Sequence, residues 1–371
     1  MSSNKTFEIE LIKYLFFNTN YSPKKIDPRA PWDIKSSFKV KLKFGVLSVL
    51  DIVERFFDKF KILIFYKNGP LMKVLEDDTF GDFKYLYDKL EEKDRKKYIQ
   101  CLAYRLFGRG MVTLPMSEEY YQKANFVQSK CVKRDDANND FCKEMFDLSD
   151  LGYPQTRLWL SAFSVMITFM EQQYAYSDIC RVLPGDYVID AGGCYGDTAL
   201  YFASLTGNEG KVYVFEFVPT NIKMMQKNLD LNHSIKDIIN IIPYPLDEIS
   251  NNKLFFIDSG PSSKVIGEYK KGYQEVRTKS IDDLVFGTSD HHIEKVDFIK
   301  MDIEGAELAA LKGAIKSIKK FKPKLAICVY HKLEDFYEIP LFIGSLGVEY
   351  KFYFDYYTPV GFEMMLYCVP I

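Results

Sequence analysis

A glycine-rich segment in the second half of the chain has residue types and an order that suit the binding of a nucleotide-like ligand. Val188 and Ile189 lead into Asp190, and two glycines and Gly196 follow before a helix-like run begins. This order predicts a strand, a tight turn and a helix start, where glycine lets the backbone approach a ligand and the helix N-terminus offers unpaired N–H groups. The pattern Asp-x-Gly-x-x-x-Gly differs from the Gly-x-Gly-x-x-Gly of dinucleotide sites. With Asp190 at the strand tip, it favours S-adenosylmethionine, whose cationic amino acid end suits a carboxylate.

Two further candidate ligand contacts follow the next predicted strands. Glu216 ends the strand predicted over 212–217, twenty positions after Gly196, where an acidic residue accepts hydrogen bonds from both ribose hydroxyls of a nucleotide. Its apolar flanks argue against a solvated carboxylate, although this feature does not separate S-adenosylmethionine from a dinucleotide. Leu246 and Asp247 follow the third strand, and we expect them to lie against the adenine ring, with Asp247 accepting from the exocyclic amine. A turn-forming role is an equally good interpretation of Asp247.

A cluster of acidic residues follows the strand predicted over 298–301. Asp302, Glu304 and Glu307 are expected at the carboxyl edge of the sheet, where ligands bind in open α/β sheets. We predict that Asp302 acts in the reaction and that Glu304 contacts the acceptor, beside the positive charge of the sulfonium. The alternative for Glu304 and Glu307 is that they are helix-start acids favoured by the helix dipole.

A histidine ends the fifth predicted strand at the same edge of the sheet. Tyr330 and His331 follow this strand, which is predicted to lie next to the strand that carries Asp302. We predict that His331 is a general base and that Tyr330 contacts the acceptor. A lone histidine is more often structural, which is the alternative. Asp302 and His331 also suit a divalent cation, but their spacing is not diagnostic of a metal site, so we predict no metal.

These candidate residues require a sheet that brings the ends of several strands together. The strands predicted from the apolar pattern are 187–190, 212–217, 238–242, 298–301 and 324–329. They alternate with helical patterns at 221–231, 306–319 and 334–345, which is typical of a parallel α/β sheet. We also predict an inserted antiparallel pair at 254–257 and 273–278, and a closing antiparallel hairpin at 351–357 and 364–369.

The part of the chain before this sheet predicts a mainly helical region. Residues 79–108 fit two helices, and the polar run 135–140 is the best boundary by composition. We therefore divide the chain into a mainly helical N-terminal region, 1–150, and a second domain, 151–371, which opens with a leading helix at 158–176. A cap over the acceptor site and a docking module for a partner are the two interpretations of the first region.

Six stretches of the C-terminal half have an order and spacing typical of one enzyme family. They are VIDAGGCYGDTALYFA, VYVFEFVPTN, IPYPLDE, SIDDL, DFIKMDIEGAELAALKGA and PKLAICVYHKLEDFYEIP. From about residue 184 to residue 370 the chain resembles the FkbM family of S-adenosylmethionine-dependent methyltransferases. The resemblance implies an α/β, class I (Rossmann-like) methyltransferase fold, with Glu216 on the cofactor's ribose and Asp302 at the transfer site. The residues implied for the amino acid part of the cofactor are Asp190, Gly192, Gly193 and Gly196. Gln173, in a segment that also resembles some members, is a further cofactor-binding candidate.

The resemblance implies an O-methyltransferase, because members of the family methylate hydroxyls, often on sugars. We therefore expect the acceptor to be a hydroxyl of a sugar in a surface glycan, a glycolipid or a glycosylated natural product. The alternatives are a non-sugar small molecule and a role as cofactor-binding subunit of a larger glycan-assembly complex. A dinucleotide oxidoreductase is disfavoured, because Gly-x-Gly-x-x-Gly is absent and the chain ends in a predicted reversed hairpin.

Charge and cysteine content bound the location and the partners. A net charge of −2 over 371 residues gives no electrostatic basis for nucleic-acid binding. Up to Lys73, fourteen Lys and Arg stand against seven Asp and Glu, so this basic front end suits peripheral membrane contact or, more simply, a solvated face. Seven cysteines without a Cys-x-x-Cys pair favour a reducing cytoplasm. The sequence has no signal-peptide pattern and no run with the length of a membrane span, so we expect a cytoplasmic location.

Overall fold

The computed structural model describes residues 80–108, 112–135, 141–154 and 156–371, together with Phe7, Glu10, Leu11 and Tyr14. Apart from those four residues, the basic front end up to Lys73, and with it the predicted membrane contact, lies outside the described residues. Within these ranges, none of the helices combines the length and the apolar composition that crossing a membrane requires.

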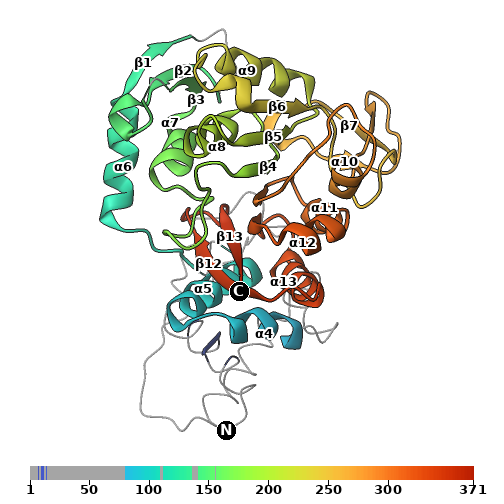
Figure 1. The fold of residues 1–371 in the computed structure, drawn as a ribbon. Helices are drawn as coiled ribbons and strands as arrows, with labels where there is room; N and C mark the ends of the chain where they lie inside the picture. Colours follow the sequence, from blue (N-terminus) through green and yellow to red (C-terminus); the bar gives the residue numbers. More distant parts are fainter. Residues whose placement is uncertain are drawn as a thin grey trace, which may run out of the picture.

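Seven strands of the described chain form one sheet (Figure 1). They are β4 (Tyr187–Ala191), β5 (Lys211–Phe215), β6 (Ile239–Ile242), β10 (Phe298–Met301), β11 (Lys324–Cys328), β12 (Tyr350–Tyr356) and β13 (Met364–Pro370), in the spatial order β12-β13-β11-β10-β4-β5-β6. The first five along the chain are parallel, whereas β13 is antiparallel to both β11 and β12. Strand β10 is buried along its whole length, as expected for a parallel strand that is covered on both faces. The predicted class I methyltransferase sheet and its closing hairpin are confirmed.

Helices connect the parallel strands and cover the sheet. They are α8 (Asp197–Thr206), α9 (Pro219–Leu229), α10 (Ile281–Phe286), α11 (Glu307–Lys312), α12 (Ile315–Phe321) and α13 (Asp335–Ser345). The single helix predicted over 306–319 is wrong, because the structure divides it into α11 and α12 at Gly313. A Cβ at Gly313 would lie 2.3 Å from the backbone oxygen of Asp247, so the chain turns where only glycine permits that approach.

A small three-stranded sheet precedes the parallel sheet along the chain. Its strands are β1 (Cys131–Arg134), β2 (Glu144–Asp147) and β3 (Arg157–Leu160). The structure therefore differs from the leading helix predicted over 158–176, since only α7 (Ala162–Val165) and the π-helical turn Met166–Met170 are helical there. Strand β3 pairs antiparallel with β2 along its whole length. The side chain of Asn228 in α9 also accepts from the N–H of Trp159 at 2.7 Å and donates to its carbonyl at 3.1 Å.

The division predicted at residue 150 falls inside this small sheet. Strands β1 and β2 pair across the polar run 135–140, so this run does not separate two domains. The two helices predicted over 79–108 are confirmed as α4 (Phe80–Lys89) and α5 (Glu92–Phe107), and α6 (Glu118–Gln128) follows them. Helices α4 and α5 pack on α13 and β12, beneath the closing hairpin in Figure 1. One buried core runs through these helices and the sheet.

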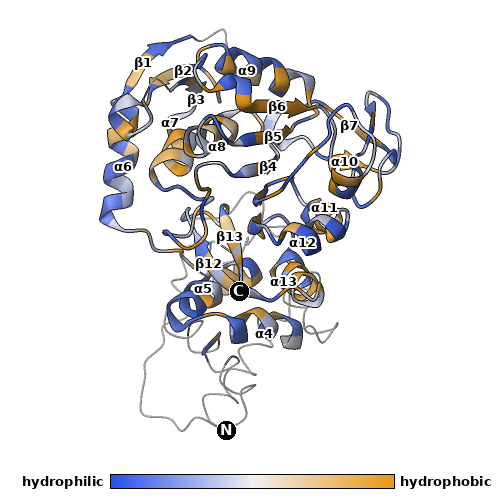
Figure 2. Cartoon of the chain, viewed as in Figure 1, coloured by the Kyte–Doolittle hydropathy of each residue, from blue (hydrophilic) through white to orange (hydrophobic). Residues whose placement is uncertain are grey.

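A second small sheet is inserted between β6 and α10. Its strands are β7 (Lys253–Phe256), β8 (Val265–Ile266) and β9 (Gln274–Arg277). The antiparallel pair predicted there is confirmed as β7 and β9. Figure 2 shows hydrophobic residues on β6, which is an edge strand of the seven-stranded sheet, and hydrophilic residues along the outer helix α5. This distribution leaves the carboxyl ends of the parallel strands as the place where polar side chains meet the core.

Candidate functional site

A pocket opens at the carboxyl ends of the parallel strands. It holds about 610 Å³ of space, which includes solvent at its mouth. The loops after β4, β5, β6 and β10 line it, and the segment between β7 and β8 closes one side. Five of the residues predicted from the sequence lie around this one space: Gly192, Glu216, Leu246, Asp302 and Glu304.

The glycines after β4 pack the loop tightly against its neighbours. Gly192 has φ +87°, and a Cβ there would lie 1.9 Å from the backbone oxygen of Asp302. A Cβ at Gly193 would lie 2.1 Å from the side chain of Val214. Gly196 precedes α8 in a left-handed conformation, φ +84°. Of these three glycines only Gly192 lines the pocket; Gly193 and Gly196 allow the loop to take its shape.

Asp190 is fully buried and forms an ion pair beneath the loop. Its Oδ1 lies 3.0 Å from the Nζ of Lys300, and its Oδ2 accepts from the hydroxyl of Thr198 at 2.6 Å. Lys300 also donates to the carbonyls of Ala191 and Gly192, at 3.1 and 2.7 Å. Burial alone disfavours the ammonium, but neighbouring carboxylates, Asp190 first, raise the pKa of Lys300 above its ordinary value. Asp190 is absent from the pocket lining and holds the glycine loop in place through Lys300.

Glu216 lies directly after β5 and faces the pocket from a fixed position. Its Oε1 accepts from the backbone N–H groups of Phe217 and Val218, both at 2.8 Å, and its Oε2 accepts from Asn221 at 3.2 Å. Burial raises the pKa of Glu216, while these hydrogen bonds lower it. The backbone of Cys194 also hydrogen-bonds to Glu216. The carboxylate is therefore held in one position at the wall of the pocket.

The two residues predicted to contact adenine lie in different surroundings. Leu246 is buried and lines the pocket among other apolar side chains. Asp247 is not part of the lining: its Oδ1 accepts from the N–H of Glu248 at 2.8 Å, and its Oδ2 accepts from Asn252 at 3.0 Å. This geometry fits the turn-forming interpretation of Asp247 and does not support the expected adenine contact.

Asp302, directly after β10, is surrounded by donors. Its Oδ2 accepts from the hydroxyl of Tyr174 at 3.0 Å and its Oδ1 from that of Tyr330 at 3.1 Å. The Nε2 of His331 lies 3.4 Å from Oδ1. Burial alone would raise the pKa of Asp302, but His331, Lys300 and the two hydroxyls bring it below its ordinary value. Asp302 is therefore a carboxylate at neutral pH.

His331 is enclosed by three carboxylates. Its side chain is 4% exposed, and its Nδ1 lies 3.0 Å from Glu307, while its Nε2 faces Asp302 and, at 3.9 Å, Glu304. Burial alone would lower the pKa of His331, but these carboxylates raise it to about 9. The imidazole therefore carries a second proton at neutral pH, and it becomes a base only when that proton leaves.

The two acids after Asp302 have different surroundings. Glu307 is fully buried at the start of α11, where it accepts from the N–H of Ile303 at 2.8 Å in addition to facing His331. Glu304 lines the pocket and forms a 3.0 Å ion pair with Lys264. Since Lys264 lies between β7 and β8, this pair joins the inserted sheet to the loop after β10. The helix-start interpretation therefore applies to Glu307 and not to Glu304.

The charge arrangement does not favour a cation held by Asp302 and His331. Donor atoms of Asp302, Glu307 and His331 do lie within 4.8 Å of one another. However, both ring nitrogens of His331 face carboxylates, and the ammonium of Lys300 already lies in the same cluster. A metal ion would have to displace the proton from His331, because only neutral imidazole is a ligand.

Three side chains of this cluster were not predicted from the sequence: Tyr174, Lys300 and Glu363. The signal for Lys300 was present, because a lysine inside an apolar strand needs a buried partner. Tyr174 and Glu363 lie in irregular segments, where no periodicity marks them. The predicted cofactor residue Gln173 is buried, but it is not part of the pocket lining and its side chain hydrogen-bonds to Glu363.

The raised pKa of His331 predicts how the stability of the unliganded protein depends on pH. The folded chain holds the proton of His331 more tightly than the unfolded chain does. The resulting contribution to the free energy of unfolding is complete below pH 6.5 and is lost as the pH rises through about 9. A shift of this size corresponds to about 3 kcal/mol. Between pH 6.5 and 9.5, we expect urea denaturation to show a larger loss of unfolding free energy in the wild type than in His331→Gln, by about that amount. Equal losses in the two proteins would contradict a charged His331.

Comparisons with known proteins agree with a methyltransferase domain around this pocket. Residues 190–352 match the family model described as the methyltransferase FkbM domain. Methyltransferase sdnD of Sordaria araneosa is 25% identical, over 40% of this chain and 70% of that protein. The solved structure of methyltransferase FkbM from Methylobacillus flagellatus KT aligns with 80% of this chain at 18% identity and a TM-score of 0.51, and the alignment spans 60% of that protein's length. Residues 190–352 of this chain therefore form a methyltransferase domain of the FkbM family.

Proposed function

We propose that this protein transfers a methyl group from S-adenosylmethionine to a hydroxyl group of an acceptor. One observation carries the proposal. Glu216 follows β5 and Asp302 follows β10, and both line one pocket at the carboxyl ends of the parallel strands. Glu216 is a fixed acceptor for ribose hydroxyls, and Asp302 is an ionised carboxylate that suits both a cationic donor and a hydroxyl acceptor. The methyltransferase domain supplies the reaction class.

The residues around the pocket fit S-adenosylmethionine. Glu216 would hold the ribose, and Leu246 would lie against the adenine among the apolar side chains of the lining. Gly192, whose missing Cβ keeps the loop against Asp302, would give the amino acid part close access to the backbone. When bound, the cofactor supplies an electrophilic methyl group on a positively charged sulfur.

The side chains around Asp302 would position the acceptor. A hydroxyl that donates to Asp302 is oriented for in-line attack, and orientation is a large part of the rate enhancement in such reactions. Tyr174 and Tyr330 fix the carboxylate by donating to its two oxygens. His331 remains our sequence-based prediction for the base, and its raised pKa means that it would act in the minority of molecules in which it is neutral.

A sugar hydroxyl is the acceptor that we propose, in a glycan, a glycolipid or a glycosylated natural product. The family resemblance supports this choice. Next to Asp302, the ring centroid of Tyr330 lies 4.2 Å from that of His331 and 6.3 Å from that of Phe362, so aromatic rings pack beside a hydrogen-bonding carboxylate. Non-sugar small molecules and a role as a binding subunit of a larger assembly are the alternatives.

The test is the transfer of isotope-labelled methyl from S-adenosylmethionine into a fractionated extract of the source cells. We expect label in the polysaccharide or glycolipid fraction, and at least about 100-fold less in Asp302→Ala, because the acceptor loses its orienting partner. Glu248→Ala, at an exposed position outside the pocket lining, is the matched control and should retain activity. Label only in small molecules or protein would contradict the sugar acceptor. No label despite intact cofactor binding would favour the binding subunit.

A further inference from the structure

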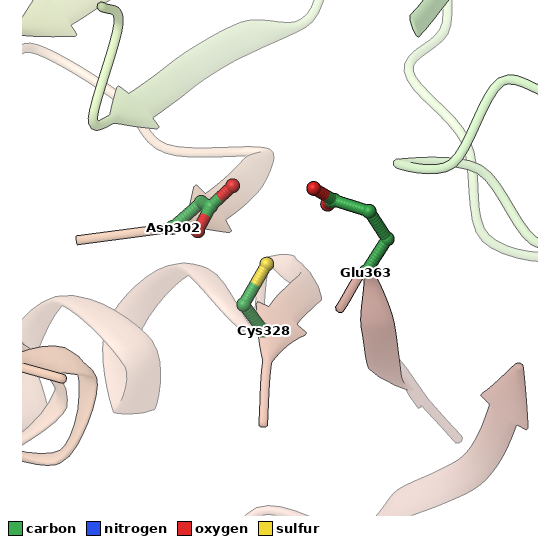
Figure 3. A group of neighbouring side chains, drawn as sticks. All are labelled: Asp302, Cys328 and Glu363. Carbon is green, nitrogen blue, oxygen red and sulfur yellow. The ribbon is translucent and has the colours of Figure 1, made fainter. Parts of the chain in front are cut away.

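Glu363 approaches Asp302 from the closing hairpin and is not itself part of the pocket lining. It immediately precedes β13, which lies on the other side of β11 from β10. Figure 3 shows the carboxylates of Asp302 and Glu363 pointing toward each other, with the thiol of Cys328 between them. One donor atom from each of these three residues lies within 4.8 Å of the others. No other carboxylate from the closing hairpin approaches Asp302 in this way among the clusters of the described residues.

The backbone holds Glu363 in an uncommon conformation. Its φ is +55°, in the left-handed region that a non-glycine residue seldom adopts. Hydrogen bonds fix the turn on both sides. The backbone N–H of Tyr357 donates to the carbonyl of Glu363 at 3.0 Å. The hydroxyl of Thr358 donates to the carbonyl of Phe362 and accepts from its N–H. This constraint aims the Glu363 side chain inward. Its Oε2 is buried and has no hydrogen-bond partner among the described residues.

Charged and titratable groups surround Glu363 from every packed element. They are Tyr120 of α6, Tyr174 after the π-helical turn, Lys300 and Asp302 of β10 and its end, Cys328 of β11, and Tyr330 and His331 after β11. Asp302 is already ionised, and two neighbouring carboxylates resist being charged together. Burial and then Asp302 raise the pKa of Glu363 to about 8, against the opposing effects of His331 and Lys300. In the unliganded protein at neutral pH, Glu363 therefore holds a proton.

We propose that Glu363 is the catalytic residue that takes the proton of the acceptor hydroxyl. The inference rests on the proposed function. In the balanced step, the acceptor oxygen forms its bond to the methyl carbon, the methyl–sulfur bond breaks with its electron pair left on sulfur, and the hydroxyl proton moves to the Glu363 carboxylate. Before that step, the positive charge of the bound sulfonium favours ionisation of Glu363, so that its own proton has left for solvent.

Glu363 suits this role better than its neighbours do. Asp302 accepts from two tyrosine hydroxyls and lies near Lys300, so it is a weak base that orients the acceptor. His331 holds its proton more tightly than Glu363 does, because the pKa of His331 is about 9 and that of Glu363 is about 8. A carboxylate whose pKa lies near the working pH combines the correct protonation state with enough driving force for proton transfer. Gln173, which hydrogen-bonds to Glu363, keeps its side chain in place.

The experiment measures protons released when ligands bind. Titration calorimetry at pH 7 in two buffers of different ionisation enthalpy compares S-adenosylmethionine with S-adenosylhomocysteine, which lacks the positive charge on sulfur. In the wild type we expect S-adenosylmethionine to release about one proton more than S-adenosylhomocysteine, because the positive charge on its sulfur favours ionisation of Glu363. The released proton belongs to the coupled pair of Asp302 and Glu363. In Glu363→Gln this difference should disappear, and the affinity for S-adenosylhomocysteine should stay within about threefold. S-adenosylmethionine should bind about tenfold more weakly to this variant, because its charge and the ionisation of Glu363 favour each other reciprocally. Glu349→Gln, at an exposed position of the same hairpin, should behave as the wild type.

Each outcome separates this inference from the proposed function. If neither ligand binds, the proposed function fails and the inference fails with it. If both bind without a difference in proton release in the wild type, or if the difference persists in Glu363→Gln and so comes from His331, the role of Glu363 is overturned while the proposed function stands. The wild-type comparison needs no variant, so poor folding of Glu363→Gln leaves it intact. With an acceptor in hand, Glu363→Gln should lower kcat about 100-fold or more.

Discussion

Asp190→Asn is expected to destabilise the folded chain by about 3–5 kcal/mol, because it leaves the ammonium of Lys300 buried without its carboxylate partner. Both side chains of this pair are at most 1% exposed, and their charged atoms lie 3.0 Å apart. Domains have unfolding free energies of roughly 5–15 kcal/mol, so this single change removes a large share of the total. Urea denaturation of the purified variant measures it directly.

Two further variants make this prediction specific. The double variant Asp190→Asn, Lys300→Met removes both charges and should recover much of the loss, because no uncompensated ion remains. Glu294→Gln breaks the exposed pair with Lys211, whose side chains are 58% and 37% exposed, and should cost less than about 1 kcal/mol. A cost for Asp190→Asn as small as that for Glu294→Gln would show that the buried pair does not hold the glycine loop.

Glu216→Ala is expected to weaken cofactor binding about 100-fold. Two hydrogen bonds from ribose hydroxyls to a carboxylate contribute about 1.5 kcal/mol each, and every 1.4 kcal/mol changes a dissociation constant about tenfold. Titration calorimetry with S-adenosylhomocysteine measures the change without any acceptor. Glu248→Ala serves as the control, since that carboxylate is exposed and outside the pocket lining.

The loss of Glu216 also removes an acceptor from the backbone of Phe217 and Val218. The melting temperature of the variant therefore has to be measured beside its affinity. An affinity within about threefold of the wild type in a folded Glu216→Ala variant would remove Glu216 from the ribose site, and with it the main support for the proposed cofactor.

The parallel sheet was predictable because its strands are short apolar runs with clear boundaries. Strand β10 was predicted at its observed bounds, Phe298–Met301, and the closing hairpin followed from two apolar runs with a short gap. The failures have long-range causes. Strand β3 pairs with β2 and bonds to Asn228, more than sixty residues away in sequence, and the break at Gly313 lies where the backbone of Asp247 approaches closely. Local patterns contain neither contact.

The candidate site shows the same limit. Glu216, Asp302 and His331 were predictable because strand ends meet at one edge of a parallel sheet. Glu363 was not, since it lies in a turn whose direction depends on how the hairpin closes. Asp190 was predicted to bind the amino acid part of the cofactor, but the structure places it beneath the loop and outside the pocket lining. Its burial was not foreseen because its partner Lys300 was missed.

The buried Asp94 of α5 has a consequence for how the chain can be shortened. It accepts from the hydroxyl of Tyr176 at 2.8 Å and from the N–H of Phe354 at 3.4 Å, and Phe354 lies on β12, the outermost strand of the seven-stranded sheet. An unprotected outer strand is a template on which a second molecule can add its own strand. A fragment that begins at residue 151 would lack α5, and with it the contact that protects β12. Activity lost through self-association of this fragment would then be mistaken for the loss of a substrate cap.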